Sequence, residues 1–379
     1  MQVEFRGSPR STLGVEVELA VVDVEKGGLV CVASPVLAEL GEGYTGGEHP
    51  RAKNELYESM LEIVTGVCET VPEAKADLSR TLHELQQHLE PRDLALACAG
   101  VHPFSEWYEL TQTASERYTE LVEAIQWPAR RLMTHGVHFH VGVRSGEKAV
   151  AINNAIVTHL PVFVALSASS PYWHGHDTGL ASVRTKIFES MPTTGLPPRL
   201  EDWADFESFM GTLIAAGSIS SVREVWWDVR PHPDFGTVEL RMCDGIPTLH
   251  EVAALAALAQ CLVTRMDEQL DAGETLPVPR EWVARENKWR AARYGIDAQL
   301  VVDESGRLEP LRDAVVRLVD ELAPTAAALG CSDELQDVLG ILEVGPSYVR
   351  QRRIVEAGGT LRDVVASLRR ELATDRPGA

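Results

Sequence analysis

Three short segments of this chain alternate strictly between apolar and ionisable residues: residues 14–19 (GVEVEL), 136–141 (GVHFHV) and 236–241 (GTVELR). Successive side chains of a β-strand point to opposite faces, so residues two apart share a face. Each segment is therefore predicted to be a strand with one buried apolar face. The other faces carry Glu16 and Glu18, His138 and His140, and Glu239 and Arg241. If the strands pair in one sheet, these groups gather on a surface suited to a hard cation and a phosphate.

The hydrophobic pattern elsewhere predicts further strands and a larger number of helices. Strand-like stretches cover residues 12–24, 95–100 and 224–244. Helical spacing of apolar residues is found in residues 72–93, 113–134, 147–168, 248–272, 282–294 and, with Gly and Pro breaks, about 308–374. Because strands and helices interleave, we predict one α+β domain over residues 1–379, with its core from about 11 to 370. Its sheet should be mainly antiparallel, with helices on one face.

Some segments depart from these periodic patterns. Residues 41–50 (GEGYTGGEHP) are a glycine-rich loop by composition, and residues 51–62 are predicted to be a helix or helical turn. Residues 169–200 mix Pro, Gly, aromatic and polar residues without a period. A long irregular segment in a compact protein is often functional, so this one is a candidate substrate lid. The last five residues, 375–379, are expected to be disordered.

Composition narrows the classes of partner. The chain has 379 residues, 45% of them hydrophobic, and a net charge of −21. Binding of nucleic acid needs a surplus of Lys and Arg, so we expect no such partner, whereas ATP needs only Mg²⁺ and a few local basic groups. The six cysteines contain no C-x-x-C pair, which disfavours a disulfide framework. No run reaches the ~18 apolar residues that span a membrane, and the N-terminus does not resemble a signal peptide. We therefore expect no membrane partner and a cytoplasmic location.

Two further carboxylates could join the polar surface. Glu55 and Glu62 are seven residues apart, so a helix would place both on one side; alternatively, Glu58 and Glu62 make that face and Glu55 is solvated. Glu62 stands in an apolar run (MLEIV), where a carboxylate must be paired or bound to a cation. Each polar pair taken alone could equally be a solvated strand face, a pair of hydrogen-bonded core histidines or a local ion pair.

The excess of carboxylates favours Mg²⁺ over zinc. Mg²⁺ takes oxygen ligands and is typically shared between a few carboxylates and substrate phosphates, whereas only the two-apart His pair argues for zinc. The sequence contains no Walker A motif, no G-x-G-x-x-G after a strand and no G-x-S-x-G elbow. The common nucleotide-binding folds and the serine hydrolases therefore have no support.

Seven stretches of the chain resemble the glutamate–cysteine ligase type 2 family of carboxylate–amine ligases. In chain order they are TLGVEVELAVVD, ELYESMLEIVTG, HGVHFHVGVRS, SASSPYW, SVRTKIFESMPTTGLPP, WWDVRPHPDFGTVELRMCD and ENKWRAARYG. The resemblance, which extends from about residue 11 to 370, implies a glutamine synthetase/guanido kinase-like fold. In that fold an antiparallel sheet curves into a funnel, with helices outside and the active site inside. The implied cofactors are ATP and Mg²⁺, and the implied metal ligands are Glu16, Glu18, Glu55, Glu62, His138 and Glu239.

The resemblance also implies a reaction. A substrate carboxylate would attack the γ-phosphate of ATP to give an acyl phosphate, and an amine would then displace phosphate to form an amide. Arg241 would contact the transferred phosphate, with Glu239 beside it, and His140 would lie among the substrate-binding groups. The implied substrates are small molecules: glutamate, through its γ-carboxylate, and an amine or an amino acid such as cysteine.

Other basic residues are candidates for holding substrate or nucleotide. Arg184 and Arg230 could bind a carboxylate, because a guanidinium does so bidentately, or they could be structural ion pairs. Lys288 and Arg290 could face the nucleotide or merely solvate the basic helix that carries them. An amide hydrolase or phosphotransferase with the same metal site, and a catalytically weak nucleotide-binding protein, are the alternative functions. Apolar helices could also support a homodimer.

Overall fold

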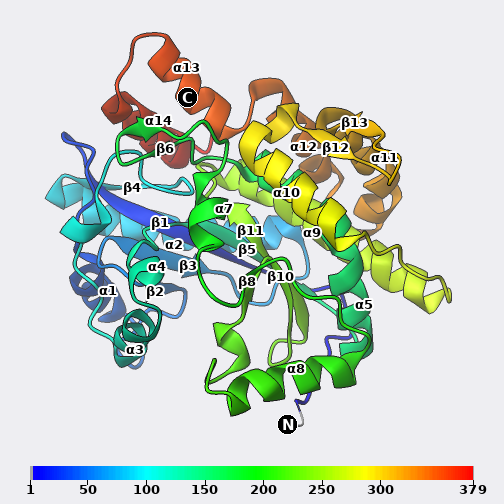
Figure 1. Ribbon diagram of the computed structural model, residues 1–379. Helices are drawn as coiled ribbons and strands as arrows, with labels where there is room; N and C mark the ends of the chain where they lie inside the picture. The colour runs from blue at the N-terminus through cyan, green and yellow to red at the C-terminus, as the bar shows by residue number, and fades with distance from the viewer. Residues whose placement is uncertain (1–2, 379) are drawn as a thin grey trace.

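The centre of the protein is a seven-stranded antiparallel sheet, shown in Figure 1. The computed structural model describes residues 3–378. The strands follow the order β10-β11-β5-β1-β3-β2, and β4 also pairs with β1. Their bounds are β1 Leu13–Asp23, β2 Ala52–Asn54, β3 Met60–Val64, β4 Leu94–Ala97, β5 Gly136–Gly142, β10 Val229–His232 and β11 Thr237–Asp244. The predicted α+β class and antiparallel pairing are confirmed.

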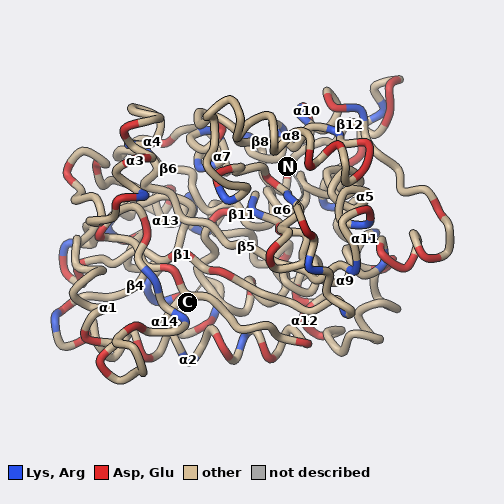
Figure 2. Tube along the Cα trace, turned by 90° about the horizontal axis from the view of Figure 1, so that it is seen from below, with Lys and Arg blue, Asp and Glu red and all other residues tan. Residues whose placement is uncertain are grey.

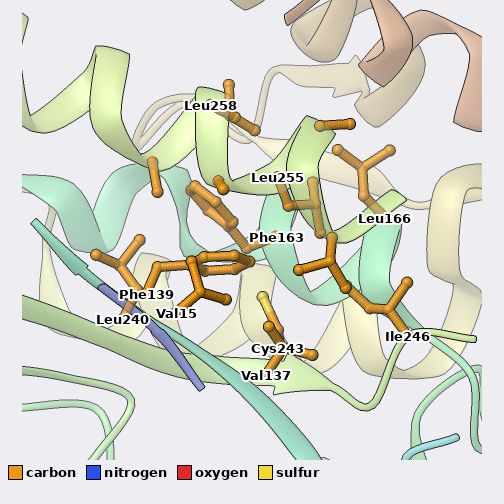
Figure 3. Packing of buried hydrophobic residues seen from close by; sticks show 14 of the residues in the cluster. Val15, Val137, Phe139, Phe163, Leu166, Leu240, Cys243, Ile246, Leu255 and Leu258 are labelled. Carbon is orange, nitrogen blue, oxygen red and sulfur yellow. The ribbon is translucent and has the colours of Figure 1, made fainter. Parts of the chain in front are cut away.

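One face of the sheet is covered by apolar helices. These are α2 (Val71–Leu89), α5 (Gly146–Ile156), α6 (Leu160–Ser167) and α9 (Leu249–Asp271). Figure 3 shows the packing: Val15, Phe139 and Leu240 point from three adjacent strands toward Phe163 of α6 and Leu255 of α9. Burial of these side chains holds the strands in register, because a slip of one residue would move every apolar side chain to the polar face.

Two helical segments in this layer are long and apolar enough to cross a membrane by length and composition. Within residues 146–167, an 18-residue stretch has a mean hydropathy of 1.7, and 78% of it is buried. Within residues 249–271, the corresponding stretch has a mean hydropathy of 1.2, and 89% of it is buried. Both are therefore core helices of this fold. The expectation of a cytoplasmic location stays a prediction.

The remaining elements surround the sheet. The helices are α1 Ala33–Gly41, α3 Glu116–Ile125, α4 Trp127–Arg130, α7 Val183–Phe188, α8 Trp203–Ala215, α10 Glu281–Tyr294, α11 Leu311–Leu329, α12 Ser332–Val344, α13 Ser347–Glu356 and α14 Leu361–Thr374. The short strands are β6 Tyr172–Trp173, β7 His176–Asp177, β8 Thr194–Gly195, β9 Trp226–Trp227, β12 Gln299–Val301 and β13 Leu308–Pro310. In the view of Figure 2, acidic residues line the outer helices and loops, with Lys and Arg scattered among them.

Three details of the predicted elements are wrong. Residues 51–62 are not helical but form β2 and the start of β3, because β3 is clamped between β1 and β2 by backbone pairing. The helix expected over residues 113–134 is broken at Gln126, whose φ of +63° is incompatible with a continuous helix. The tail is not disordered at Asp375, which accepts a hydrogen bond from the backbone N–H of His250 (2.7 Å) and pairs with Lys75 (2.8 Å). Residue 379 lies outside the described residues.

Candidate functional site

Strand register brings the ionisable residues of the three alternating segments onto one face. Glu16 of β1 lies opposite His138 of β5, and His140 of β5 lies opposite Glu239 of β11. On the other side of β1, Glu18 lies opposite Glu62 of β3. The prediction that these groups share a surface is confirmed, and it follows from the pleat, because facing residues in paired strands point to the same side.

This polar face forms the floor of a cavity of about 300 Å³. The residues that line it come from the strands β1, β2, β3, β5, β9, β10 and β11, from the helices α3 and α7, and from loops between them. Of the residues singled out from the sequence, it is lined by Glu16, Glu18, Glu55, Glu62, His138, His140, Arg184, Arg230, Glu239 and Arg241. Ten groups from distant parts of the chain therefore meet in one place.

Glu16 connects two groups of potential metal ligands. One group is Glu16, Glu62 and His138, the other is Glu16, His140 and Glu239, and within each the ligand atoms lie within 4.8 Å of one another. Oε2 of Glu16 is 2.9 Å from Nδ1 of His138, and its Oε1 is 3.4 Å from Nε2 of His140. Nε2 of His140 is also 3.7 Å from Oε1 of Glu239.

The electrostatics keep both carboxylates of this cluster ionised. Burial opposes ionisation of Glu16, but hydrogen bonds and charge from His138 and His140 hold its pKa well below the ordinary value. Burial likewise opposes ionisation of Glu239, but Arg230 and Arg241 outweigh it and hold the pKa of this carboxyl well below its usual range. The carboxylates of Glu16 and Glu239 therefore stay ionised, and both are suitable ligands for a cation.

A third group, Glu18, Glu55 and Glu62, consists only of carboxylates. Burial, with the charge of Glu18 next, raises the pKa of Glu55 to about 8. Burial and the charges of Glu16 and Glu55 raise the pKa of Glu62 well above its ordinary value. Lys53 approaches Glu62 only to 3.8 Å and is half exposed. Glu55 and Glu62 therefore tend to keep their protons in the absence of a cation. Once they ionise, the group offers three hard oxygen ligands, which fits Mg²⁺.

Glu55 and Glu62 reach the cavity by a route different from the predicted one. Glu62 projects from β3 opposite Glu18, and Glu55 follows the end of β2. The helical spacing proposed for the two residues is therefore wrong, although both line the cavity. Glu58, the alternative, instead accepts hydrogen bonds from the backbone N–H (2.8 Å) and hydroxyl (2.6 Å) of Ser34.

The cationic side of the cavity contains donors without partners. The Nε atoms of Arg184 and Arg241 are buried and make no hydrogen bond within the part of the chain that is described. Arg184 is 3% exposed, and its Nη1 donates a long hydrogen bond of 3.5 Å to the carbonyl oxygen of Met242. Arg241 also contacts Glu239 through Nη1. A buried N–H donor without an acceptor costs free energy, and an anionic ligand would supply the acceptor. This side of the cavity therefore suits a phosphate or a carboxylate group.

Arg230 differs from these two residues. Its Nε donates to Oε2 of Glu239 at 2.6 Å. Its Nη1 donates to three backbone carbonyl oxygens, those of Val222 (3.3 Å), Arg223 (3.1 Å) and Val225 (2.6 Å). These contacts fix Glu239 and the chain that leads into β9, so the predicted role of Arg230 in binding a substrate carboxylate stays a prediction.

The structure corrects the placement of the two residues expected at the nucleotide from α10. Lys288 is 3% exposed and pairs with Asp228 (2.6 Å) and Glu189 (2.7 Å), behind the cavity wall. The carbonyl oxygen of Asp228 accepts the backbone N–H of Arg241 (2.8 Å), so Lys288 supports the strand that carries Arg241. Arg290 pairs with Glu286 (2.7 Å) and donates to the carbonyl oxygen of Gln299 (3.1 Å), and it does not line the cavity.

Several lining residues were missed from the sequence. They include Asn54, Arg117, Tyr118, Arg223, Trp226, His232 and Phe235. His232 follows Arg230 by two residues in a strand, so alternation of side chains places it on the same face as Arg230, and this signal could have found it. Arg117 and Tyr118 carry no comparable signal, because α3 reads as an ordinary amphipathic helix.

Comparison with known sequences matches the chain to the model of the glutamate–cysteine ligase family 2 over residues 12–367. A Frankia casuarinae protein named "Putative glutamate–cysteine ligase 2-1" is 54% identical over 378 residues, covering 100% of this chain and 99% of its own length. The Thermobifida fusca protein of the same name, without the final numeral, is 51% identical and covers 100% of this chain and 94% of its own length.

Solved structures agree at the level of fold. The glutamate–cysteine ligase of Francisella tularensis in complex with AMP has a TM-score of 0.70 at 12% identity, and the match covers 98% of this chain and 90% of that one. A bifunctional glutathione synthetase from Pasteurella multocida has a TM-score of 0.69 at 14% identity, covering 97% of this chain and 53% of that one. With the family model and the close relatives, these findings establish that the chain belongs to the glutamate–cysteine ligase family 2 and is a carboxylate–amine ligase.

Proposed function

We propose that this ligase joins the γ-carboxylate of glutamate to an amine or amino acid such as cysteine, with ATP and Mg²⁺. The observation that supports the proposal is the cavity itself. In it, two ionised carboxylates and two carboxyls of raised pKa adjoin guanidinium groups with unpaired donors. Carboxylates and imidazole on one side suit a hard cation, and guanidinium groups on the other suit phosphate and carboxylate. We also propose that the sheet curves as a funnel around this cavity.

In this proposal the side chains act mainly by positioning and by electrostatics. Mg²⁺ would neutralise the triphosphate, with Glu16, Glu18, Glu55, Glu62, His138 and Glu239 as its ligands. Arg241, held by Glu239, donates to the phosphoryl group as charge shifts during transfer to the substrate carboxylate. Arg184 donates to a substrate carboxylate. An amine then attacks the acyl phosphate, and release of phosphate leaves the amide.

A screen for ADP release tests this function. Purified protein with ATP and Mg²⁺ is given each of a panel of acids paired with amino acids and simple amines, and products are identified by mass spectrometry. We expect ADP release that requires both an acid and an amine, with an amide product whose mass is the sum of the two less water. Amide cleavage without ATP, or a stable phosphorylated product, would contradict ligation and favour a hydrolase or a phosphotransferase.

The raised pKa values of Glu55 and Glu62 predict that Mg²⁺ binding releases protons. Below about pH 8 the carboxyl of Glu55 is protonated in the metal-free protein, and burial raises the pKa of Glu62 well above its ordinary value. A cation binds the ionised form of both groups. Affinity for Mg²⁺ should therefore rise with pH between 6 and 8, by up to about tenfold per unit for one linked proton, and level off above 8. Calorimetry at pH 6.5 in two buffers of different ionisation enthalpy measures the released protons.

The exposed carboxylate of Glu42 provides a control for this titration. The Glu42→Gln variant should release as many protons as the wild type, whereas Glu55→Gln should release fewer and bind Mg²⁺ more weakly. Affinity that is independent of pH from 6 to 8, without proton release, would contradict the group of Glu18, Glu55 and Glu62 as a metal site.

A further inference from the structure

The hairpin between β10 and β11 carries a pair of stacked rings at the cavity. His232 and Phe235 have ring centroids 4.1 Å apart and an interplanar angle of 8°. His232 is 6% exposed, whereas Phe235 is 56% exposed, and both line the cavity. One face of the Phe235 ring is thus covered by His232, and much of the rest is open to solvent.

Two other aromatic residues of the cavity, Phe188 and Tyr118, are less free to accept a flat ligand. Phe188 lies under the guanidinium of Arg184, with 5.3 Å between Cζ and the ring centroid. The hydroxyl of Tyr118 donates to the carbonyl oxygen of Asn54 (3.3 Å). An apolar ring held open at the mouth of a polar cavity is unfavourable in water, so a ligand surface that covers it gains free energy.

The turn of this hairpin is held by packing and by a backbone hydrogen bond. Gly236 has a φ of +64°, and a Cβ atom there would lie 1.9 Å from the carbonyl oxygen of Arg6, so the N-terminal segment packs directly against the turn. The backbone N–H of Arg6 also donates to the carbonyl oxygen of Pro233 (3.0 Å). A ring fixed before the ligand arrives loses little conformational entropy on binding.

The ring pair adjoins the cation-ligand cluster. The His140 ring lies 5.5 Å from the rings of both His232 and Phe235, and its Nε2 is 3.4 Å from Glu16. Burial lowers the pKa of His232 to about 4, so at neutral pH the stacked pair is uncharged. A ligand with a flat base at one end and phosphates at the other would span from the hairpin across His140 toward Arg241.

We propose that Phe235, backed by His232, is the stacking platform for the purine base of the nucleotide. This inference rests on the proposed use of ATP, and it assigns the two ends of the cavity to different ligands. The base lies at the β10 end of the sheet, and the acid and amine lie toward the β2 end, under α3. Figure 1 shows β10 and α3 on opposite sides of the central strands, as the strand order requires.

Calorimetric binding of Mg–ADP and of Mg–tripolyphosphate tests the platform without relying on turnover. Loss of base–aromatic stacking by Phe235→Ala should weaken Mg–ADP about 10- to 100-fold and leave Mg–tripolyphosphate, which has no base, within about twofold. Phe235→Tyr keeps the ring and should stay within about threefold for both. Tyr108, a 65% exposed aromatic residue outside the cavity, provides the matched control, and Tyr108→Ala should change neither affinity.

The possible results test the stacking role of Phe235 separately from the proposed function of the protein. Equal weakening of both ligands by Phe235→Ala, or no weakening of either, overturns the platform and leaves the proposed function standing. A wild-type protein that binds tripolyphosphate and no nucleotide overturns both. Selective loss of ADP affinity, restored by Phe235→Tyr, establishes the base at the β10 end.

Discussion

Replacing Glu16 by Gln is expected to lower turnover about 1,000-fold or more while the protein stays folded. Glu16 is shared by two of the three potential ligand groups, so its loss weakens two metal positions at once. The amide keeps the size of the side chain and can still accept a hydrogen bond from His138, but it removes the negative charge that the cation requires. A thousandfold loss corresponds to about 4 kcal/mol of transition-state stabilisation, which is within the range for a metal ion at a transferring phosphoryl group.

The matched control is Glu109→Gln, which makes the same chemical change at an exposed position outside the cavity. ADP release, Mg²⁺ affinity and the thermal unfolding midpoint are measured for both variants. Glu109→Gln should match the wild type in all three, and Glu16→Gln should lose activity and Mg²⁺ affinity without a large fall in midpoint. Wild-type turnover by Glu16→Gln would refute the assignment of the cluster as a metal site.

The polar face could be predicted from the sequence because a strand has a period of two. In residues 14–19, 136–141 and 236–241 the alternation is strict, so each segment has one possible buried face. Leu240, Phe139 and Val15 then fix the register across three strands, and Glu239, His140 and Glu16 follow on the opposite side. The sequence does not show that these three strands pair with one another. Once they pair, however, only this choice of faces buries the apolar residues of all three.

Prediction failed where the pattern was ambiguous. Residues 60–64 are apolar on both faces except for Glu62, so neither a period of two nor one of 3.6 stands out, and the helix predicted over residues 51–62 runs into the start of β3. The helix spacing nevertheless selected Glu55 and Glu62 for the site. Only the pairing of β3 between β1 and β2, which is a tertiary interaction, decides the backbone conformation.

Basic residues on α10 illustrate a second limit. The sequence predicts the helix, but it does not reveal that Asp228 and Glu189 lie against Lys288. The sequence alone does not distinguish the buried Lys288, which lies between two carboxylates, from the partly buried Arg290 two residues later. The sequence of the irregular segment 169–200 likewise does not reveal its contacts. Ser169, Ser170 and Ser182 all donate hydrogen bonds to the buried carboxylate of Asp244. These three residues are anchored, so a lid can involve only other residues of the segment.

A second large effect is expected far from the cavity, at Arg350 of α13. Its guanidinium is 5% exposed and pairs with Glu251 of α9 (2.8 Å) and Glu371 of α14 (2.7 Å). The Arg350→Met variant keeps most of the side-chain volume but leaves two buried carboxylates facing each other without a cation. We expect the free energy of unfolding to fall by about 3–5 kcal/mol, the usual cost of removing one partner from a buried ion pair.

Urea denaturation measures this loss of stability. Two further variants distinguish the contribution of the ion pairs from that of side-chain packing. Arg353→Met alters an exposed arginine on the same helix and should cost less than about 0.5 kcal/mol. The triple variant Arg350→Met, Glu251→Gln, Glu371→Gln removes the stranded charges, and it should recover much of the lost stability, because uncharged groups are cheaper to bury than unpaired carboxylates. If the single and triple variants are equally unstable, the loss comes from packing between α9, α13 and α14. A triple variant of near wild-type stability means instead that the ion pairs add little net stability, and that Arg350 is needed because the fold has buried two carboxylates beside it.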